Sequence, residues 1–296
     1  MNKKIYVLSL ILFVILLWAA NFVFISILLM EIEPFTALTL RFIVISILLF
    51  PFMLKLPNLK DFLYLFIATL LIVPGHFGLL FLSIQSTKSL GGISLLIQLS
   101  IPFSILLSWI IFKDIPSKLR IFGLFISFVG IIFLLYDPNL LESRKAFILA
   151  IFSALFLGFY FILVKKIKKV KSIAIIAWTS FLGIPMMNLF MLYDNQSFSV
   201  LSDIQNNMTY YSFFYVVIAG SILGHGIWAY LLKIEDISFI SPFLLLIPLL
   251  TSILSIFVFN EQVTFRFIII GTVIIIGIFL VFISKQTKER KNNEYS

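Results

Sequence analysis

The sequence predicts an all-α membrane protein with ten transmembrane helices, arranged as two inverted five-helix repeats with both termini in the cytoplasm. Three observations support this fold class. Only 12% of the 296 residues are charged and 61% are hydrophobic, whereas roughly a quarter of the residues in a soluble domain are charged. Ten apolar runs are long enough to cross a bilayer. The second five of these runs resemble the first five in sequence.

The ten predicted helices follow one another along most of the chain. A spanning helix needs about 20 mostly apolar residues. Glycine, proline and histidine interrupt the third and eighth runs, which are therefore the least regular. The first run follows Lys3 and Lys4, as a secretory signal would, but it continues past Ala20, so we interpret it as a helix. The predicted segments are 5–28, 34–54, 62–84, 89–112, 119–136, 146–164, 172–193, 210–232, 238–259 and 265–284.

The distribution of basic residues predicts the orientation, because cytoplasmic loops of membrane proteins are rich in Lys and Arg. With the N-terminus inside, 17 of the 22 basic residues fall in cytoplasmic segments, most densely at 165–171 and 285–291. The predicted outer loops at 29–33 and 194–209 contain acids and no basic residue. We interpret the cluster at 165–171 as an orientation signal; a site for anionic lipid headgroups is the alternative.

The two halves of the chain show internal similarity. Phe112-Lys-Asp114 and Phe259-Asn-Glu261 each end one long run and precede another, and Gly75-His76 resembles Gly224-His225. Five helices in each half place the second copy upside down relative to the first, as in many secondary transporters. Chance similarity between Phe- and Ile-rich helices is the alternative. The predicted repeats are 5–137 and 144–284, followed by a cytoplasmic tail at 285–296.

Several short motifs together resemble a known transporter family. They are Leu17-Trp18-Ala-Ala-Asn21-Phe22, Leu40-Arg41-Phe42, Leu95-Leu-Ile-Gln98, Gly224-His-Gly-Ile-Trp228 and Ser241-Pro242-Phe-Leu-Leu-Leu-Ile-Pro248, followed by Asn260-Glu261. In this order they resemble the EamA-type branch of the drug/metabolite transporter superfamily, over residues 5–284. Within that branch the sequence is most similar to bacterial exporters of O-acetylserine and cysteine. The resemblance implies a secondary transporter of 5 + 5 helices in the bacterial inner (plasma) membrane.

The sequence departs from the branch at two places. An acid followed by arginine is usual after the ninth helix, but Glu261-Gln262 stands here, and its counterpart in the first half is Lys113-Asp114. Neither histidine of this chain is a hallmark of the branch. We therefore expect site chemistry that is particular to this protein.

His76 and His225 are the first candidates for the functional site. They are the only histidines in the chain, and they occupy equivalent places in the repeat. Ionisable residues at membrane depth are costly and therefore usually functional. A histidine, which titrates near pH 6.5, can couple proton movement to transport or bind a carboxylate. The alternative is two neutral histidines bonded to neighbouring carbonyls, which would hold helices together.

Polar and aromatic residues on three of the predicted helices extend the candidate site. Trp18 and Asn21 are three residues apart and share a helix face, and His225 and Trp228 repeat this spacing. Gln98 lies within the fourth segment and needs a hydrogen-bond partner there. Trp18, Asn21, Gln98 and Trp228 are predicted to contact substrate, with helix packing as the alternative for each. Gly220 and Gly224 form a small-xxx-small pattern that allows close helix approach.

Arg41 lies about 10 Å inside the second helix, measured from its outer end at about 1.5 Å per residue. It is a candidate for binding a substrate carboxylate. The alternative is that it reaches outwards and pairs with Glu31 or Glu33.

Other classes of function are excluded or unsupported. The absence of cysteine excludes disulfides and cysteine nucleophiles, and the chain has no Gly-Lys-Ser/Thr phosphate loop. Two histidines without acids or cysteines nearby are too few to bind a metal, and we predict no cofactor. The net charge of +9 lies in loops between apolar runs, which argues against nucleic-acid binding. No repeated filter residues indicate a channel.

We therefore expect a secondary active transporter, not an enzyme, that exports a small amino-acid-like metabolite of the cysteine or O-acetylserine type, with proton exchange as the coupling. An importer or exchanger of another metabolite, such as a nucleoside-related compound, is the alternative. A membrane-embedded lipid-modifying enzyme is a weaker one, since no cluster of acids, histidines or nucleophiles lies at one interface. The expected partners are the small-molecule substrate and the lipid bilayer; the sequence does not determine the oligomeric state.

Overall fold

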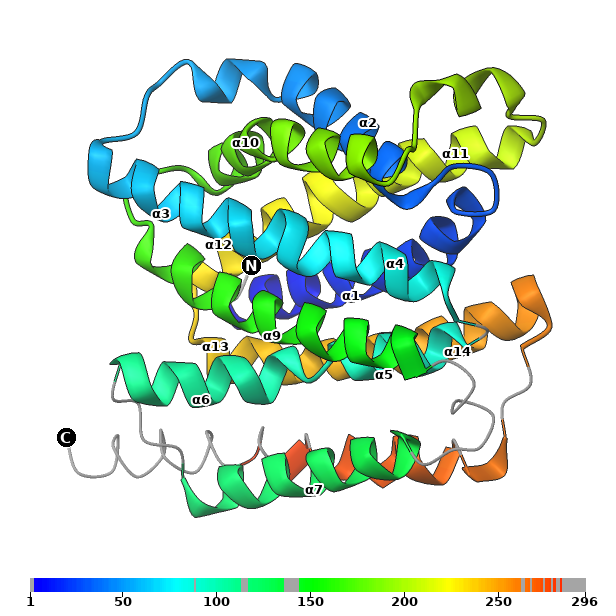
Figure 1. Cartoon of the computed structure of the whole chain (residues 1–296). Helices are drawn as coiled ribbons and strands as arrows, with labels where there is room; N and C mark the ends of the chain where they lie inside the picture. Colours follow the sequence, from blue (N-terminus) through cyan, green and yellow to red (C-terminus); the bar gives the residue numbers. More distant parts are fainter. Residues whose placement is uncertain are drawn as a thin grey trace.

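The computed structural model is helical in nearly every part of the chain that it describes. The described residues are 3–87, 89–112, 117–135, 144–261, 264–266, 268–273, 275–277, 279–280 and 283. The Lys113-Asp114 motif and the predicted tail at 285–296 lie outside them. Figure 1 shows the helices lying side by side in one bundle.

The first half of the chain forms five helical stretches within the described residues. Two of them consist of several consecutive elements, and a short 3-10 turn, η1 (Phe50–Met53), follows the second stretch. The stretches are α1 (Lys3–Leu28); α2 (Pro34–Leu48); α3 (Leu59–Leu70), η2 (Leu71–Gly78) and α4 (Leu79–Gln85) in continuity; α5 (Leu90–Ile97) and α6 (Ser100–Phe112); and α7 (Lys118–Leu135).

The second half follows the same order. A 3-10 turn, η3 (Phe198–Asp203), lies in the loop before its third stretch. Its stretches are α9 (Arg144–Lys166); α10 (Ser172–Tyr193); α11 (Asn207–Tyr215), η4 (Val216–His225) and α12 (Gly226–Ile234); and α13 (Ile237–Ile240), η5 (Ser241–Leu245) and α14 (Leu246–Phe259). A last apolar helix runs over Ile268–Gly277.

Six of these helical stretches are long and apolar enough to cross a membrane by length and composition. They correspond to the first, third, fourth, sixth, seventh and eighth predicted segments. Shorter apolar helices lie at the second, ninth and tenth predicted segments. An all-α membrane architecture is therefore confirmed, and ten crossings remain a prediction. The six are Ile5–Leu28, Leu59–Gln85, Leu90–Ile111, Arg144–Lys166, Ser172–Tyr193 and Asn207–Ile234.

Prolines explain where the helices differ from the predicted segments. The second segment was predicted to reach residue 54, but α2 ends at Leu48 and Pro51 lies in the following 3-10 turn. Proline lacks a backbone N–H and disfavours helical geometry at the preceding residue. A turn at residues 98–99 separates α5 from α6, and Pro102 occupies the first turn of α6, where proline is tolerated. The ninth segment begins with the short helix α13, and the 3-10 turn that follows it contains Pro242.

The third and eighth stretches are not broken at their glycines and histidines but widen there into π-helix. The π segments are η2 and η4, and they contain His76 and His225. π turns within α-helices are rare and often mark functional sites. Gly75 allows close packing in η2, because a Cβ atom on it would lie 2.7 Å from Cγ of Phe156 on α9.

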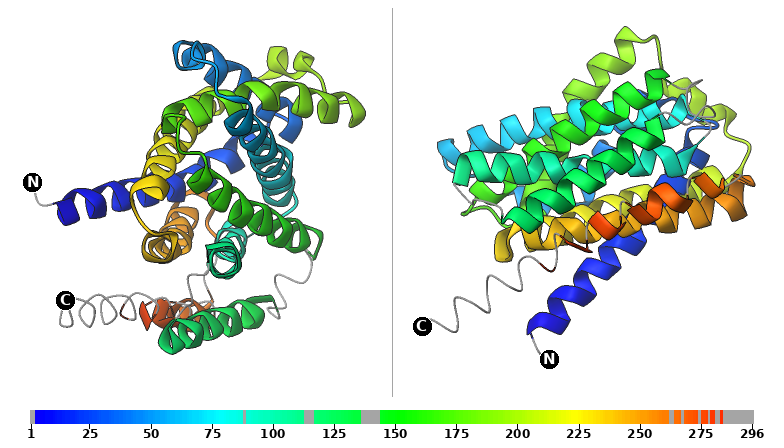
Figure 2. Two further views of the ribbon diagram at one scale, coloured as in Figure 1. Left: turned by 90° about the vertical axis from the view of Figure 1, so that its left-hand side faces the viewer. Right: turned by 90° about the horizontal axis from the view of Figure 1, so that it is seen from below.

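The contacts between helices come in pairs that are related by exchange of the two halves. α9 packs on η2 and α6, and its counterpart α1 packs on η4 and α14; α2 packs on its counterpart α10. At one side of the bundle, α7 lies beside the last described residues (Figures 1 and 2). A Cβ atom on Gly277 would lie 2.6 Å from the carbonyl oxygen of Gly123 on α7, so these two segments are in close contact.

Candidate functional site

Two small cavities lie within the bundle, and together they are lined by helices of both halves. The first, which we call the Arg41 cavity, measures about 20 Å³, and the second, the Trp18 cavity, about 50 Å³. A buried water needs roughly 10–15 Å³ on this measure, so the cavities have room for a few waters. Phe77 and His225 line both. The Arg41 cavity is also lined by Arg41, Tyr160, Thr179 and Ser221, and the Trp18 cavity by Trp18, Asn21, His76 and Gln98.

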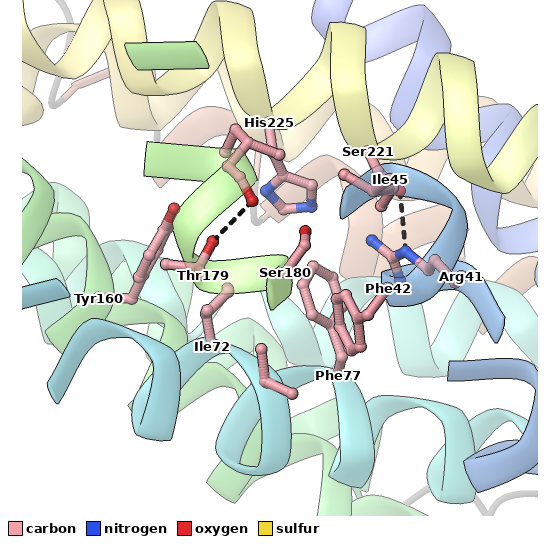
Figure 3. A pocket seen from close by; sticks show the side chains of 12 residues that line it. Arg41, Phe42, Ile45, Ile72, Phe77, Tyr160, Thr179, Ser180, Ser221 and His225 are labelled. Carbon is pink, nitrogen blue, oxygen red and sulfur yellow. Dashed lines mark hydrogen bonds between the residues drawn. The ribbon is translucent and has the colours of Figure 1, made fainter. Parts of the chain in front are cut away.

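Arg41 is a buried cation without an anionic partner in the described part of the chain. Its side chain is 1% exposed. Nε donates a hydrogen bond to Oγ of Ser221 at 2.8 Å, and the guanidinium carbon lies 4.0 Å from the ring centroid of Phe77. Nη1 is buried and has no hydrogen-bond partner within the described residues. Figure 3 shows Arg41 and His225 directed toward the same space from different helices.

The alternative of an outward-reaching Arg41 does not match the structure. Glu31 accepts hydrogen bonds from the backbone N–H groups of Gln205 and Asn206, at 3.4 and 3.3 Å, and from the hydroxyl of Thr209 at 2.5 Å. These groups lie at the beginning of α11, where a carboxylate is favoured by free N–H donors and by the helix dipole. Glu31 therefore joins α1 to α11, and Arg41 points into the bundle.

His76 is held by α9 through one of its two ring nitrogens. Nδ1 lies 2.8 Å from Oγ and 3.3 Å from the carbonyl oxygen of Ser153, and Oγ of Ser153 donates to the carbonyl oxygen of His76 at 3.0 Å. Because the serine proton is used in that bond and a carbonyl only accepts, Nδ1 carries the hydrogen. Nε2 is then an acceptor without a hydrogen-bond partner among the described residues, on a side chain that lines the Trp18 cavity.

His225 is held by aromatic packing instead. Its ring centroid lies 4.7 Å from that of Trp18 and 5.1 Å from that of Phe77. Nδ1 is buried without a hydrogen-bond partner. Both histidines line the Trp18 cavity, but within the described residues only His76 has the backbone-carbonyl bond of the packing alternative.

Trp18 and Asn21 lie on the same face of α1, and both line the Trp18 cavity. Nε1 of Trp18 donates to the carbonyl oxygen of Gly220 at 3.1 Å, whereas Oδ1 of Asn21 has no hydrogen-bond partner. Gly220 and Gly224 face these two side chains so closely that a Cβ on either glycine would overlap them. The small-xxx-small pattern thus packs η4 against α1.

The other two predicted residues, Gln98 and Trp228, differ in their position relative to the cavities. Gln98 lines the Trp18 cavity, 2% exposed, and its Nε2 donates to the carbonyl oxygen of Ser94 at 2.9 Å. Trp228 lines neither cavity. Its ring packs against that of Trp18, with the centroids 5.6 Å apart, and also contacts the ring of Phe161. Its position is that of a packing residue.

Several residues of the site had no distinctive signal in the sequence. Ser153 and Ser221 bind His76 and Arg41, and Phe77 lies between the two cavities. Serine and phenylalanine are too common in this chain to stand out, and their partners are distant in sequence. Ser221 lies inside the small-xxx-small pattern, which the sequence indicated only as a packing feature. No group of three His, Cys, Asp or Glu that could hold a metal occurs among the described residues.

Comparison with known proteins gives the chain a family. The sequence profile of the EamA-like transporter family matches twice, at residues 5–136 and 144–283. An uncharacterized transporter of Archaeoglobus fulgidus is 27% identical over 295 residues, covering 95% of this chain and 98% of the relative. A probable amino-acid metabolite efflux pump of Salmonella typhimurium is 26% identical over 247 residues, covering 80% and 81%.

A solved crystal structure has the same fold. It superimposes with a TM-score of 0.72 at 12% identity, covering 95% of this chain and 98% of the other. The two profile matches together span nearly all of the chain and coincide with the two halves of the helix order. This protein therefore belongs to the EamA-like transporter family and is a membrane transporter rather than an enzyme.

Proposed function

We propose that this transporter exports a small amino-acid-like metabolite, a class that includes amino acids such as cysteine and acetylated derivatives such as O-acetylserine. One observation carries the proposal: a buried arginine, with no acidic partner among the residues that the structure describes, lies beside the two histidines, in cavities between the halves. A buried charge without a counter-ion is costly, and a substrate carboxylate would supply the counter-ion. The Salmonella relative, a probable amino-acid metabolite efflux pump, supports the class and the direction.

The same proposal assigns substrate contact to residues of both cavities. Arg41 binds the carboxylate, and Asn21 and Gln98 offer hydrogen bonds to the rest of the molecule. Trp18 supplies an apolar wall. Trp228 packs against Trp18 and so supports this wall. Because the cavities have room only for waters, substrate entry requires the halves to move apart, which agrees with alternating access in transporters built from repeats.

Proton exchange is the coupling that we propose for export. Nε2 of His76 is a free acceptor, and Nδ1 of His225 has no partner within the described chain. A histidine without a fixed partner can take up or release a proton as the cavity opens to either side. Both histidines line the Trp18 cavity, so a proton on either would be close to a bound substrate.

We also propose ten crossings as two inverted repeats in the bacterial inner membrane, with both termini cytoplasmic. The chain contains no cysteine, so single cysteines report topology directly. Lys168→Cys and Ser199→Cys both introduce the thiol at exposed loop positions. A membrane-impermeant maleimide added to spheroplasts is expected to label position 199 and to label position 168 only after lysis. The opposite pattern would reverse the orientation.

Transport itself is tested in inside-out vesicles, with vesicles that lack the protein as control. The panel contains labelled cysteine, O-acetylserine, N-acetylserine and uridine, each with and without an imposed proton gradient. Gradient-stimulated uptake of an amino-acid-like member is expected. Uptake of uridine alone would favour the nucleoside-related alternative, and uptake of none would refute the proposed function.

A further inference from the structure

The charges around the two cavities are unbalanced. Arg41 lines the Arg41 cavity, and neither cavity has an Asp or Glu among its lining residues. The nearest acid in sequence, Glu33, lies at the start of α2, and Glu31 is bound to the beginning of α11. Within the described part of the chain, the site therefore has a permanent cation and no permanent anion.

From this imbalance we propose that the substrate is a net anion: a small carboxylate whose amino group is absent or acylated, rather than a zwitterionic amino acid. The inference rests on the proposed function and narrows its substrate class to amino-free or N-acylated members, so that zwitterions such as cysteine and O-acetylserine would be poorer substrates. Arg41 has unused N–H donors, and a guanidinium binds a carboxylate through two parallel hydrogen bonds. Nη1, buried without a partner, is one such donor.

An ammonium group would find no counter-charge in this site. Placed in the Trp18 cavity it would meet the neutral side chains of Asn21 and Gln98, and it would share the site with the Arg41 cation. Aromatic faces can attract a cation, but the ring of Trp18 is already packed against His225 and Trp228. Transfer of a charged group from water to a buried site that offers it no partner is strongly disfavoured.

A neutral acyl-amide matches the polar groups around the Trp18 cavity better. Oδ1 of Asn21 and Oγ of Ser100 are buried without hydrogen-bond partners, and Nε2 of His76 is a free acceptor. An amide N–H can donate to such acceptors, and its carbonyl can accept from the serine hydroxyl. Phe77 and His225 line both cavities, so their movement would join the two spaces around one extended molecule.

The test compares three related compounds of different charge in proteoliposomes that contain the full-length protein: zwitterionic serine, anionic N-acetylserine and neutral N-acetylserinamide. Only N-acetylserine is expected to be taken up. Arg41→Gln is expected to reduce its uptake by roughly 10-fold or more, the effect of losing a hydrogen bond to a charged group. The matched control is Arg144→Gln, at an exposed position at the start of α9, and it should transport like the wild type.

The wild-type series alone decides the inference, even if the Arg41 variant fails to fold. Uptake of serine equal to or faster than that of N-acetylserine would overturn the anion preference and leave the proposed function intact. Equal uptake of N-acetylserinamide would overturn the role of the carboxylate. If neither these three compounds nor cysteine and O-acetylserine are transported, the proposed function falls, and the inference falls with it.

Discussion

Alanine at position 75 would place its Cβ atom 2.7 Å from Cγ and 3.1 Å from Cβ of Phe156, across the contact between η2 and α9. These are atoms near the backbone of α9, so a rotation of the phenyl ring does not remove the overlap. Gly78 lies three residues later in the same π segment and offers a matched control. A Cβ atom there would have its nearest neighbour, the carbonyl oxygen of Val73, at 3.7 Å, which is an ordinary contact.

The expected difference in stability follows from comparing the two alanine variants. Neither glycine has a positive φ angle, so alanine at either position should recover the roughly 0.5–1 kcal/mol that glycine costs within a helix. Only Gly75→Ala adds overlap, and overpacking typically costs about 1–3 kcal/mol. Because the backbone gain is common to both, Gly75→Ala should be less stable than Gly78→Ala by about 1–3 kcal/mol.

The assay is the free energy of unfolding in mixed micelles, measured for both single variants and for Gly75→Ala in a Phe156→Ala background. Removing the phenyl ring should relieve the overlap, with a favourable coupling energy of about 0.5–3 kcal/mol, the range for residues in contact. If the two single variants are equally stable, or the coupling is zero, then η2 and α9 do not pack as closely as described.

The remaining predictions concern the histidines and the beginning of α2. His76→Ala and His225→Ala should each abolish transport, or its dependence on the proton gradient, at unchanged protein levels in the membrane; unchanged rates and pH profiles in both would refute their role in coupling. Oε1 of Gln196 accepts the N–H groups of Phe35 and Thr36 at 2.9 and 3.1 Å. Gln196→Ala should therefore lower the unfolding free energy by about 1–3 kcal/mol, the cost of buried unsatisfied donors. Nε2 of Gln196 also donates to Oδ2 of Asp194 at 2.7 Å, so Gln196→Glu, which keeps the acceptor, is compared with Gln196→Ala in an Asp194→Asn background, where the two carboxylates do not meet. Gln196→Glu should lose less stability there, and equal losses would argue against this cap.

Hydropathy located the helices well because it averages over about 20 residues, which is the length of a span. It did not mark the end of α2, although Pro51 was visible, because the apolar run continues past the proline to Leu54. The glycines around His76 and His225 signalled irregular helices, but not π turns. A π turn accommodates one extra residue, and whether it forms depends on the neighbouring helices rather than on local sequence.

The candidate site was predictable to the extent that its residues are rare. Few ionisable residues occur at membrane depth, so Arg41 and the two histidines stood out. Their partners did not, because Ser221 lies 180 residues from Arg41 and Ser153 lies 77 residues from His76. Glu31 and Glu33 are close to Arg41 in the sequence, and the sequence therefore indicated them as its alternative partners.

The two histidines hold equivalent places in the repeat, yet their surroundings differ in a way that divides their roles. Exchange of the halves relates the contact of α9 with η2 to that of α1 with η4. On α9, Ser153 fixes the orientation and tautomer of His76; on α1, the ring of Trp18 packs against His225, and its N–H bonds to Gly220. A ring held by packing alone can turn without losing a protein hydrogen bond. We therefore propose that His225, which lines both cavities, changes partners as a substrate passes, while His76 presents a constant acceptor.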